Sequence, residues 1–267
     1  MTSTSPVHDP LLGAWAVLGE PRVTAELARS GVGWIGLDAQ HGHFDDRSLR
    51  DTLGLRPSGA APMLVRVAAN DAALIGRALD AGADGVVVPL VDSVADAERA
   101  VAASHYPPAG ARSWGPLNGS RPIHGPGSDS GPHAVPLCAV MIETAAALDA
   151  VEAIAAVPGV DMIFVGPFDL SLALGLQPDD LLAAHAGEDA HLTRITRACK
   201  HAGITAGAYA GTPERAALLA AAGFEWIAAT TDAALLSLGV GEVRRRVLSD
   251  GAAQPAQEAF NAGNASS

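Results

Sequence analysis

Short apolar runs alternate with longer amphipathic stretches along most of the chain. Continuous apolar runs of this kind are typical of buried parallel strands, whereas apolar positions repeated every three or four residues are typical of helices. The runs predict eight strands, at Ala14–Leu18, Trp34–Asp38, Met63–Val67, Gly85–Pro89, Leu137–Glu143, Asp161–Gly166, Thr205–Tyr209 and Trp226–Thr230. The stretches between them predict helices that include Asp71–Ala81, Ser93–Ala103, Thr144–Val157 and Pro213–Ala222.

This alternation predicts the α/β class and, within it, a single (β/α)8 TIM barrel over residues 13–249. An open doubly wound sheet is the alternative, because alternation alone does not show that the sheet closes. The first strand is not followed by the Gly-x-Gly-x-x-Gly turn that would favour a dinucleotide site.

Three segments depart from the alternation. Residues 1–12 form an N-terminal extension before the barrel. Residues 107–136 are rich in Pro, Gly and Ser and too long for an ordinary connection, so they predict a loop insert that is functional, contact-forming or mobile. Residues 250–267 contain little that could be buried and predict a disordered tail.

Composition and charge add expectations about the core and the partners. Hydrophobic residues make up 49% of the chain and aromatic residues only 4%, so the core should consist mainly of Ala, Val, Leu and Ile. The net charge of −12 opposes binding to a phosphate backbone, which argues against a nucleic-acid partner.

The location of the protein is predicted from what the chain lacks. No uninterrupted apolar stretch reaches the length of about 20 residues that crosses a bilayer, so no membrane partner is expected. The first residues lack a basic start and an apolar run, and Cys138 and Cys199 provide no disulfide framework. These features predict a cytoplasmic protein.

In such barrels the active site lies at the carboxyl ends of the strands. Five polar side chains stand there, namely Asp38, His41, Arg66, Glu143 and Asp169. Glu143 and Asp169 follow consecutive strands about 5 Å apart, so both could bind one divalent ion, and oxygen ligands suit Mg2+ or Mn2+. Alternatively, both acids serve as helix N-caps or first-turn residues.

Arg66 and His41 also have a chemical and a structural interpretation. Arg66 could bind a carboxylate or neutralise an oxyanion, or it could form a structural ion pair in the barrel mouth. His41 could be a general base oriented by Asp38, or an ordinary loop histidine. Lys200, the only lysine, is predicted near the amino-terminal face, which excludes a Schiff base at the site.

Six short motifs follow one another along the chain, at Gly36–Gly42, Leu64–Arg66, Val87–Val91, Tyr106–Arg112, Met141–Thr144 and Phe164–Ser171. In this order, from about Gly13 to Leu238, they resemble the HpcH/HpaI family of metal-dependent 2-oxo-acid aldolases, which includes 4-hydroxy-2-oxoheptanedioate aldolase. The resemblance implies a class II aldolase that cleaves a 4-hydroxy-2-oxo acid to pyruvate, or a similar 2-oxo acid, and an aldehyde. The reaction would pass through an enolate stabilised by a divalent metal ion (Mg2+, Mn2+ or Co2+).

The resemblance also implies roles for single residues. Glu143 and Asp169 would hold the metal, Arg66 would contact the pyruvyl oxygen, and His41 would be the base with Asp38 behind it. The amides near Phe168 and Asp169 would hold the substrate carboxylate. Gly166, Pro167 and Gln40 would also belong to the substrate-binding residues, with Arg66 and Phe168. Family members are commonly hexamers, so the resemblance implies a homo-oligomer in which the insert touches a neighbour.

The chain departs from the family pattern at two positions beside the expected site. It has Gln40 where Glu is usual and Met141 where Gln is usual. These departures put the acceptor and the native reaction in question. A CoA-ester lyase of the citrate lyase β or malyl-CoA type, which resembles this fold and also uses a carboxylate-bound metal, is a competing interpretation, although the chain has few basic residues for CoA phosphates. A non-catalytic oxo-acid-binding barrel and a purely structural barrel are two more.

Overall fold

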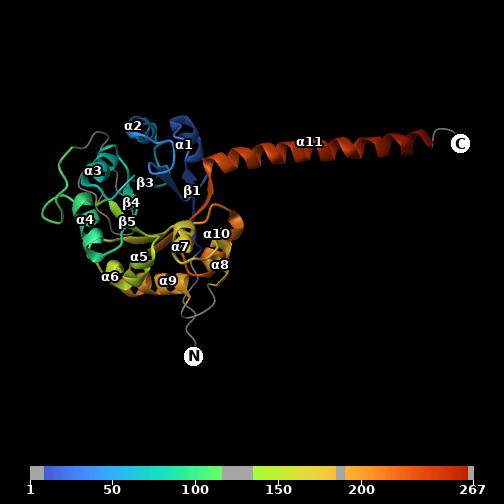
Figure 1. Cartoon of the computed structure of the whole chain (residues 1–267). Coiled ribbons are helices and arrows are strands. Elements are labelled where there is room, and N and C mark those ends of the chain that lie inside the picture. The colour runs from blue at the N-terminus through green and yellow to red at the C-terminus, as the bar shows by residue number, and fades with distance from the viewer. Residues whose placement is uncertain (1–8, 116–134, 185–189, 264–267) are drawn as a thin grey trace, which may run out of the picture. The chain divides into compact units, whose positions relative to one another are not determined.

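Eight parallel strands pair in sequence order, and the eighth pairs with the first, so the sheet closes into a barrel (Figure 1). The computed structural model describes residues 9–115, 135–184 and 190–263, with side chains up to residue 248. Closure confirms the predicted (β/α)8 barrel and rules out the open sheet. The strands are β1 (Leu11–Ala16), β2 (Trp34–Asp38), β3 (Met63–Arg66), β4 (Gly85–Val88), β5 (Leu137–Ile142), β6 (Met162–Val165), β7 (Thr205–Tyr209) and β8 (Trp226–Thr231).

Strand β1 differs most from its prediction, because it is shifted towards the N-terminus relative to Ala14–Leu18. Its first residues pair with β8, so it begins within residues 1–12, which the sequence predicts as an extension. At its other end, the backbone N–H groups of Val17 and Leu18 donate to the Asp232 carboxylate at 2.9 and 3.2 Å. The strand ends where the backbone N–H groups donate to the Asp232 carboxylate and no longer to a neighbouring strand.

Helices connect the strands on the outside of the barrel. Their bounds are α1 (Pro21–Leu27), α2 (Asp46–Gly54), α3 (Ala72–Asp80), α4 (Val94–Ser104), α5 (Ala145–Asp149), α6 (Val151–Ala155), α7 (Pro167–Ala173), α8 (Pro178–Ala183), α9 (His191–Ala202), α10 (Pro213–Ala221) and α11 (Asp232–Gly263). The predicted helix Thr144–Val157 is interrupted at Ala150, which leaves the helical conformation at ψ 7°. No Gly or Pro lies at the break, and its cause is not evident in the sequence.

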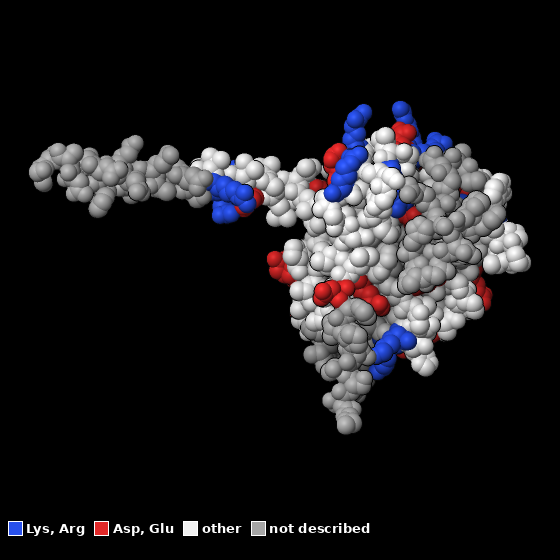
Figure 2. Space-filling model, turned by 180° about the vertical axis from the view of Figure 1, so that it is seen from behind, with Lys and Arg blue, Asp and Glu red and all other residues white. Residues whose placement is uncertain are grey.

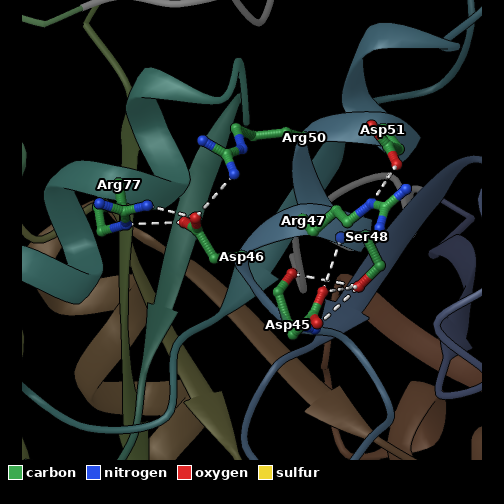
Figure 3. Close-up of polar contacts among 7 residues, drawn as sticks. All are labelled: Asp45, Asp46, Arg47, Ser48, Arg50, Asp51 and Arg77. Carbon is green, nitrogen blue, oxygen red and sulfur yellow. Dashed lines mark hydrogen bonds and ion pairs between the residues drawn. The ribbon is translucent and has the colours of Figure 1, made fainter.

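Helix α2 is fixed at its start and against α3 by charged side chains (Figure 3). The Asp45 carboxylate accepts a hydrogen bond from the Ser48 N–H at 2.7 Å, and the Ser48 hydroxyl accepts one from the Asp45 N–H, which forms a capping box. Asp46 accepts from Arg77 Nε of α3 at 2.7 Å. These contacts hold together the two helices that follow β2 and β3.

The segment predicted as a loop insert, residues 107–136, is described only in part. Residues 116–134 lie outside the described residues. Within residues 107–115, Arg112 is buried and donates to Asp80 of α3 at 2.6 Å. The start of the segment is therefore attached to the helical layer.

The chain divides into two units, Met1–Asp232 and Ala233–Ser267. The second consists largely of α11, which continues to Gly263 and so occupies most of residues 250–267, where the sequence predicts a disordered tail. Ala, Gln and Glu in this segment favour a helix, whereas Gly251 and Pro255 within it do not. Apolar side chains of α11 are exposed at Leu235, Leu236, Leu238, Val240, Val243, Val247 and Leu248.

The described surface carries mixed charge. On the face drawn in Figure 2, acidic and basic side chains lie near one another in small groups. Exposed ion pairs such as Arg194–Glu152, at 2.7 Å, account for part of this mixture. No helix among the described residues is both long and apolar enough to cross a bilayer.

Two apolar layers fill the barrel unit, and they differ in composition. The layer between strands and helices is aliphatic, as the sequence predicts. The interior of the barrel is instead filled largely by aromatic and Met side chains, among them Trp15, Trp34, Met141, Met162 and Phe164. The prediction of an aliphatic core therefore holds for the outer layer and is wrong for the barrel interior.

Glycines in the strands make room for these large side chains. A Cβ on Gly36 would lie 2.2 Å from the Trp15 ring, and one on Gly13 would lie 2.3 Å from Trp34. Trp15 in turn stacks on Phe164, with ring centroids 5.4 Å apart and an interplanar angle of 17°. The few aromatic residues are thus concentrated where the strand glycines admit them.

We expect Gly36→Ala to destabilise the fold by about 1–3 kcal/mol, because the added methyl group overpacks the barrel interior. Gly76→Ala in α3 is the matched control, since its Cβ would meet no atom within 4 Å. That change should leave stability equal or raise it by up to about 1 kcal/mol, as Ala is the better helix former. Urea unfolding of both variants measures the difference, and equal stabilities would contradict the close packing described above.

Candidate active site

A cavity of about 260 Å3 opens at the carboxyl ends of the strands. Its walls combine charged groups with aromatic rings, from Trp15, Val17, Asp38, His41, Arg66, Met141, Phe164, Gly166, Phe168, Asp169 and Tyr209. The structure thus brings together four of the five polar residues singled out in the sequence. The fifth, Glu143, lies directly behind the wall, because a Cβ on Gly166 would come within 3.1 Å of its Oε2.

Asp38 and Arg66 form a two-pronged ion pair at the ends of β2 and β3. Arg66 Nε donates to Asp38 Oδ1 at 2.9 Å, and Arg66 Nη2 donates to Asp38 Oδ2 at 2.6 Å. The Asp38 side chain is 2% exposed and that of Arg66 is 11% exposed. The structural ion pair considered for Arg66 therefore exists, and the guanidinium also faces the cavity, so one role does not exclude the other.

The Asp38 carboxylate is held by more than Arg66. Trp15 Nε1 donates to it at 3.2 Å, and the backbone N–H groups of Gln40 and His41 donate to Oδ1 at 3.0 and 3.1 Å. Burial alone would raise the pKa of this carboxyl, but Arg66 and the backbone donors together lower it. Asp38 is thus an anion that fixes Arg66 and the turn after β2.

The sequence predicts that Asp38 orients the His41 imidazole, and the geometry differs. Among the described contacts, Asp38 accepts from the His41 backbone N–H, while its oxygens are taken up by Arg66, Trp15 and the turn. Asp38 lies directly opposite Arg66 on the neighbouring strand, and a carboxylate in this position pairs with the full charge of the guanidinium before it pairs with an imidazole. His41 itself is exposed at the cavity wall.

Glu143 directly follows β5 and is 4% exposed. Its Oε1 accepts a hydrogen bond from the Leu90 backbone N–H at 2.8 Å. Burial raises the pKa of this carboxyl, and the negative charge of Asp169 raises it further. The N-cap of α5 is Thr144, so the helix-cap alternative does not describe Glu143.

Asp169 lies in the first turn of α7, as the structural alternative for this residue expects, and it also lines the cavity. β5 and β6 are neighbours, with Ile142 opposite Val165. The two carboxylates therefore emerge from adjacent strand ends, and each influences the other electrostatically.

The predicted substrate contacts are placed unequally. Gly166 and Phe168 line the cavity, while Pro167, at the start of α7, and Gln40 are not among its lining residues. The Gln40 side-chain oxygen is buried without a hydrogen-bond partner. Met141, the other departure from the family pattern, forms part of the cavity wall.

Three residues of this region are not predicted from the sequence. Trp15 lies next to the last residue of β1, and Tyr209 is the last residue of β7. Both side chains line the cavity. Leu90 adopts a positive φ of 53°, which is unusual for a residue other than Gly, and this conformation places its N–H on Glu143. An aromatic residue at the end of an apolar strand is the available signal for Tyr209. Leu90 lies within the motif Val87–Val91, but nothing in that motif indicates that its backbone N–H contacts Glu143.

The residues present fit a hard divalent cation better than a zinc site. Among the described residues, no group of three or more His, Cys, Asp or Glu side chains could hold a metal. Two carboxylates from adjacent strand ends, completed by water and substrate oxygens, are the ligand set that Mg2+ or Mn2+ accepts. Burial is the main cause that raises the pKa of Glu143, and the negative charge of Asp169 raises it further; a bound cation would relieve that repulsion.

Lys200 lies in the last turn of α9, which leads into β7. It is therefore at the amino-terminal end of the barrel, away from the cavity at the carboxyl ends. This placement confirms that the only lysine of the chain is not positioned to form a Schiff base with a substrate in the cavity.

Comparison with known proteins gives consistent matches. The sequence matches the HpcH/HpaI aldolase/citrate lyase family over residues 11–237. It is 37% identical to a hydroxypyruvate/pyruvate aldolase of Paraburkholderia phytofirmans, over 84% of this chain and 88% of that one. It is 35% identical to a 2-dehydro-3,6-dideoxy-6-sulfogluconate aldolase of Pseudomonas putida, over 87% and 90%. A crystal structure of an HpcH/HpaI aldolase/citrate lyase family protein from Burkholderia cenocepacia superposes with a TM-score of 0.76 at 29% identity, covering 90% of this chain and 95% of that one.

Proposed function

Since the chain belongs to the HpcH/HpaI aldolase/citrate lyase family, we propose that it is a divalent-metal-dependent carbon–carbon lyase. Its reaction is the reversible cleavage of a 4-hydroxy-2-oxo acid to pyruvate, or a similar 2-oxo acid, and an aldehyde. The observation that carries this proposal is the gathering of Glu143, Asp169 and Arg66 around one small cavity. Two carboxylates that can hold a cation and one guanidinium lie around the same space. An enolate oxygen bound there would be stabilised by positive charge from both sources.

Each residue has a part in this reaction. Glu143 and Asp169 hold the divalent ion, which when bound supplies the Lewis-acid charge that stabilises the enolate. Arg66, fixed by Asp38, donates to the oxo group from the β3 side. The backbone at Gly166 and Phe168 borders the space for the substrate carboxylate.

His41 is the base of the proposed cleavage. It takes the proton of the C4 hydroxyl while the C3–C4 bond breaks, so C4 leaves as the aldehyde and the electron pair stays on C3 as the enolate of pyruvate. Protonation of C3 then gives pyruvate. The exposed position of His41 at the cavity wall lets its imidazole exchange protons with solvent between the two steps.

The direct test is the loss of the pyruvate methyl proton signal in D2O with purified protein, followed by NMR. We expect deuterium uptake with Mg2+ or Mn2+ and none after chelation, because enolate formation does not require the aldehyde. Release of an aldehyde from a 4-hydroxy-2-oxo acid under the same conditions completes the test. No uptake despite demonstrated metal binding would contradict the proposal and would favour a CoA-ester lyase or a binding protein.

The proposed enzyme is a homo-oligomer, and a hexamer is the expected form. The exposed apolar side chains along α11 support association, because a row of Leu and Val in water is typical of a surface that another chain covers. Light scattering of the full chain measures the mass, and a monomer at micromolar concentration would contradict this part of the proposal.

A further inference from the structure

Tyr209 faces the cavity from the side opposite Arg66. It ends β7, whereas Arg66 ends β3, and these strands are four apart in a closed barrel of eight. The ring is fixed by aromatic neighbours, with Trp15 at 5.8 Å and Phe168 at 6.0 Å between centroids. Its position is therefore set by packing, which is what a residue that recognises a substrate requires.

The Tyr209 hydroxyl has no hydrogen-bond partner among the described residues, although the side chain is partly buried. A Cβ on Gly211 would lie 3.1 Å from the phenol oxygen, so the missing side chain at Gly211 makes room for the hydroxyl beside this turn. Burial raises the pKa of the phenol, so it remains a neutral donor at the pH of an assay. A hydroxyl placed in this way is available to water or to a ligand.

The other polar groups of the cavity each have an assigned role in the proposed reaction. Arg66 and Asp169 serve the 2-oxo acid, Asp38 holds Arg66, and His41 serves as the base. Trp15 and Phe168 lie beside Tyr209 in the wall. Behind Phe168 lies the Arg215 guanidinium, 4.9 Å from the ring centroid, and it is paired with Asp179. Tyr209 is thus the polar group left for the other reactant, the aldehyde.

The cavity limits the kind of aldehyde. Its volume of about 260 Å3 is small for a ligand pocket, so it leaves room for a short chain beside the 2-oxo acid. The one Arg or Lys among the lining residues, Arg66, is paired with Asp38. A charged tail on the aldehyde would therefore lack a partner there, whereas a neutral hydroxyl would meet the phenol.

We propose that Tyr209 is a specificity-determining residue that hydrogen-bonds a hydroxyl next to the aldehyde carbonyl, so that the enzyme prefers short hydroxyaldehydes to unsubstituted aldehydes. This inference rests on the proposed function. It concerns the selection of the aldehyde and leaves enolate formation untouched, and this separation makes it independently testable.

The test compares Tyr209→Phe with Tyr106→Phe, which removes the hydroxyl of the only other tyrosine. Tyr106 lies after α4, and its buried hydroxyl likewise lacks a partner. Aldol addition of pyruvate to glyceraldehyde and to propanal is measured with Mg2+, and kcat/KM is compared between the two aldehydes. Ratios between variants cancel differences in aldehyde hydration.

We expect the wild-type protein to prefer glyceraldehyde and Tyr209→Phe to lower kcat/KM for it about tenfold, the effect of one neutral hydrogen bond. Activity with propanal should stay nearly constant, and Tyr106→Phe should change neither. Equal losses with both aldehydes in Tyr209→Phe would show a purely structural role and overturn the inference, as would an unchanged ratio.

Deuterium uptake by pyruvate without aldehyde separates the two proposals. Uptake in wild type and Tyr209→Phe alike, together with an unchanged aldehyde preference, would overturn the role of Tyr209 and leave the proposed function standing. Absence of uptake in the wild type would overturn the proposed function, and the Tyr209 inference with it.

Discussion

Glu143→Gln should abolish metal-dependent deuterium uptake by pyruvate, with a fall of about 10³-fold or more. The amide keeps the shape of the side chain and can still accept the hydrogen bond from Leu90, but it removes the negative charge that binds the cation. Lewis-acid stabilisation of an enolate is worth several kcal/mol, and each 1.4 kcal/mol is about a factor of ten in rate. NMR of the methyl signal measures the rate, and titration with Mn2+ measures the loss of affinity.

The control for this change is Glu152→Gln in α6. Glu152 is a half-exposed acid of the same β5–β6 connection and pairs with Arg194 on the outer surface. Its replacement should leave both uptake and metal binding as in the wild type. The Glu143 variant should unfold no more easily than the wild type, since its burial disfavours the charge that is removed. Wild-type uptake in Glu143→Gln would place the metal elsewhere.

Asp38→Asn should destabilise the barrel by about 3–5 kcal/mol, because it leaves the Arg66 guanidinium buried without its counter-charge. For a chain of this size the midpoint of thermal unfolding should fall by about 10 °C. Activity should fall as well, because Arg66 loses the two hydrogen bonds that aim it. The double variant Asp38→Asn with Arg66→Met should be more stable than the sum of the single changes predicts, since no unpaired charge remains.

The exposed pair between Asp46 and Arg77 provides the comparison (Figure 3). Asp46→Asn should shift the unfolding midpoint only slightly, because exposed ion pairs contribute little. A shift as large as that of Asp38→Asn would contradict the argument from burial.

The pH dependence of the Asp38 effect has a definite sign. The pKa of Asp38 is lower in the folded protein than in the unfolded chain, so its contribution is complete above the unfolded pKa and is lost as the pH falls through the folded one. The stability difference between wild type and Asp38→Asn should therefore persist from neutral pH down to the ordinary range of an Asp carboxyl and shrink only below it. A difference that disappears near pH 6 would contradict this account.

The fold was largely predictable because strand and helix patterns alternate without ambiguity, and β2 and β7 have the predicted ends. Strand β1 was not, since its end depends on the carboxylate of Asp232, more than 200 residues away in sequence. The composition of the barrel interior was also missed. The amino-acid composition gives the number of aromatic residues but not their positions in the fold. Their clustering inside the barrel follows only from the closed sheet.

The sequence places Arg66, Glu143 and Asp169 at strand ends, and the structure brings all three to the same end of the barrel. Their roles in the reaction remain predictions. For Asp38 the sequence suggests His41 as the partner, whereas the structure pairs the carboxylate with Arg66, for which a structural ion pair is one of the two expected roles. The role of Leu90 could not be predicted either. Its contribution to the site is a backbone N–H in an unusual conformation, and such a contribution leaves no mark on residue type.

The cluster of rings in the barrel interior gives the protein an optical reporter of its own. Trp15 lines the cavity and contacts Trp34, and Trp34 contacts Trp226, so three of the four indoles form a connected group reaching the site. The fourth, Trp114, is 62% exposed. Emission from the connected group should respond to whatever fills the cavity, whereas a water-soluble quencher would mainly dim Trp114. Occupancy of the site could then be followed in the unlabelled protein during turnover.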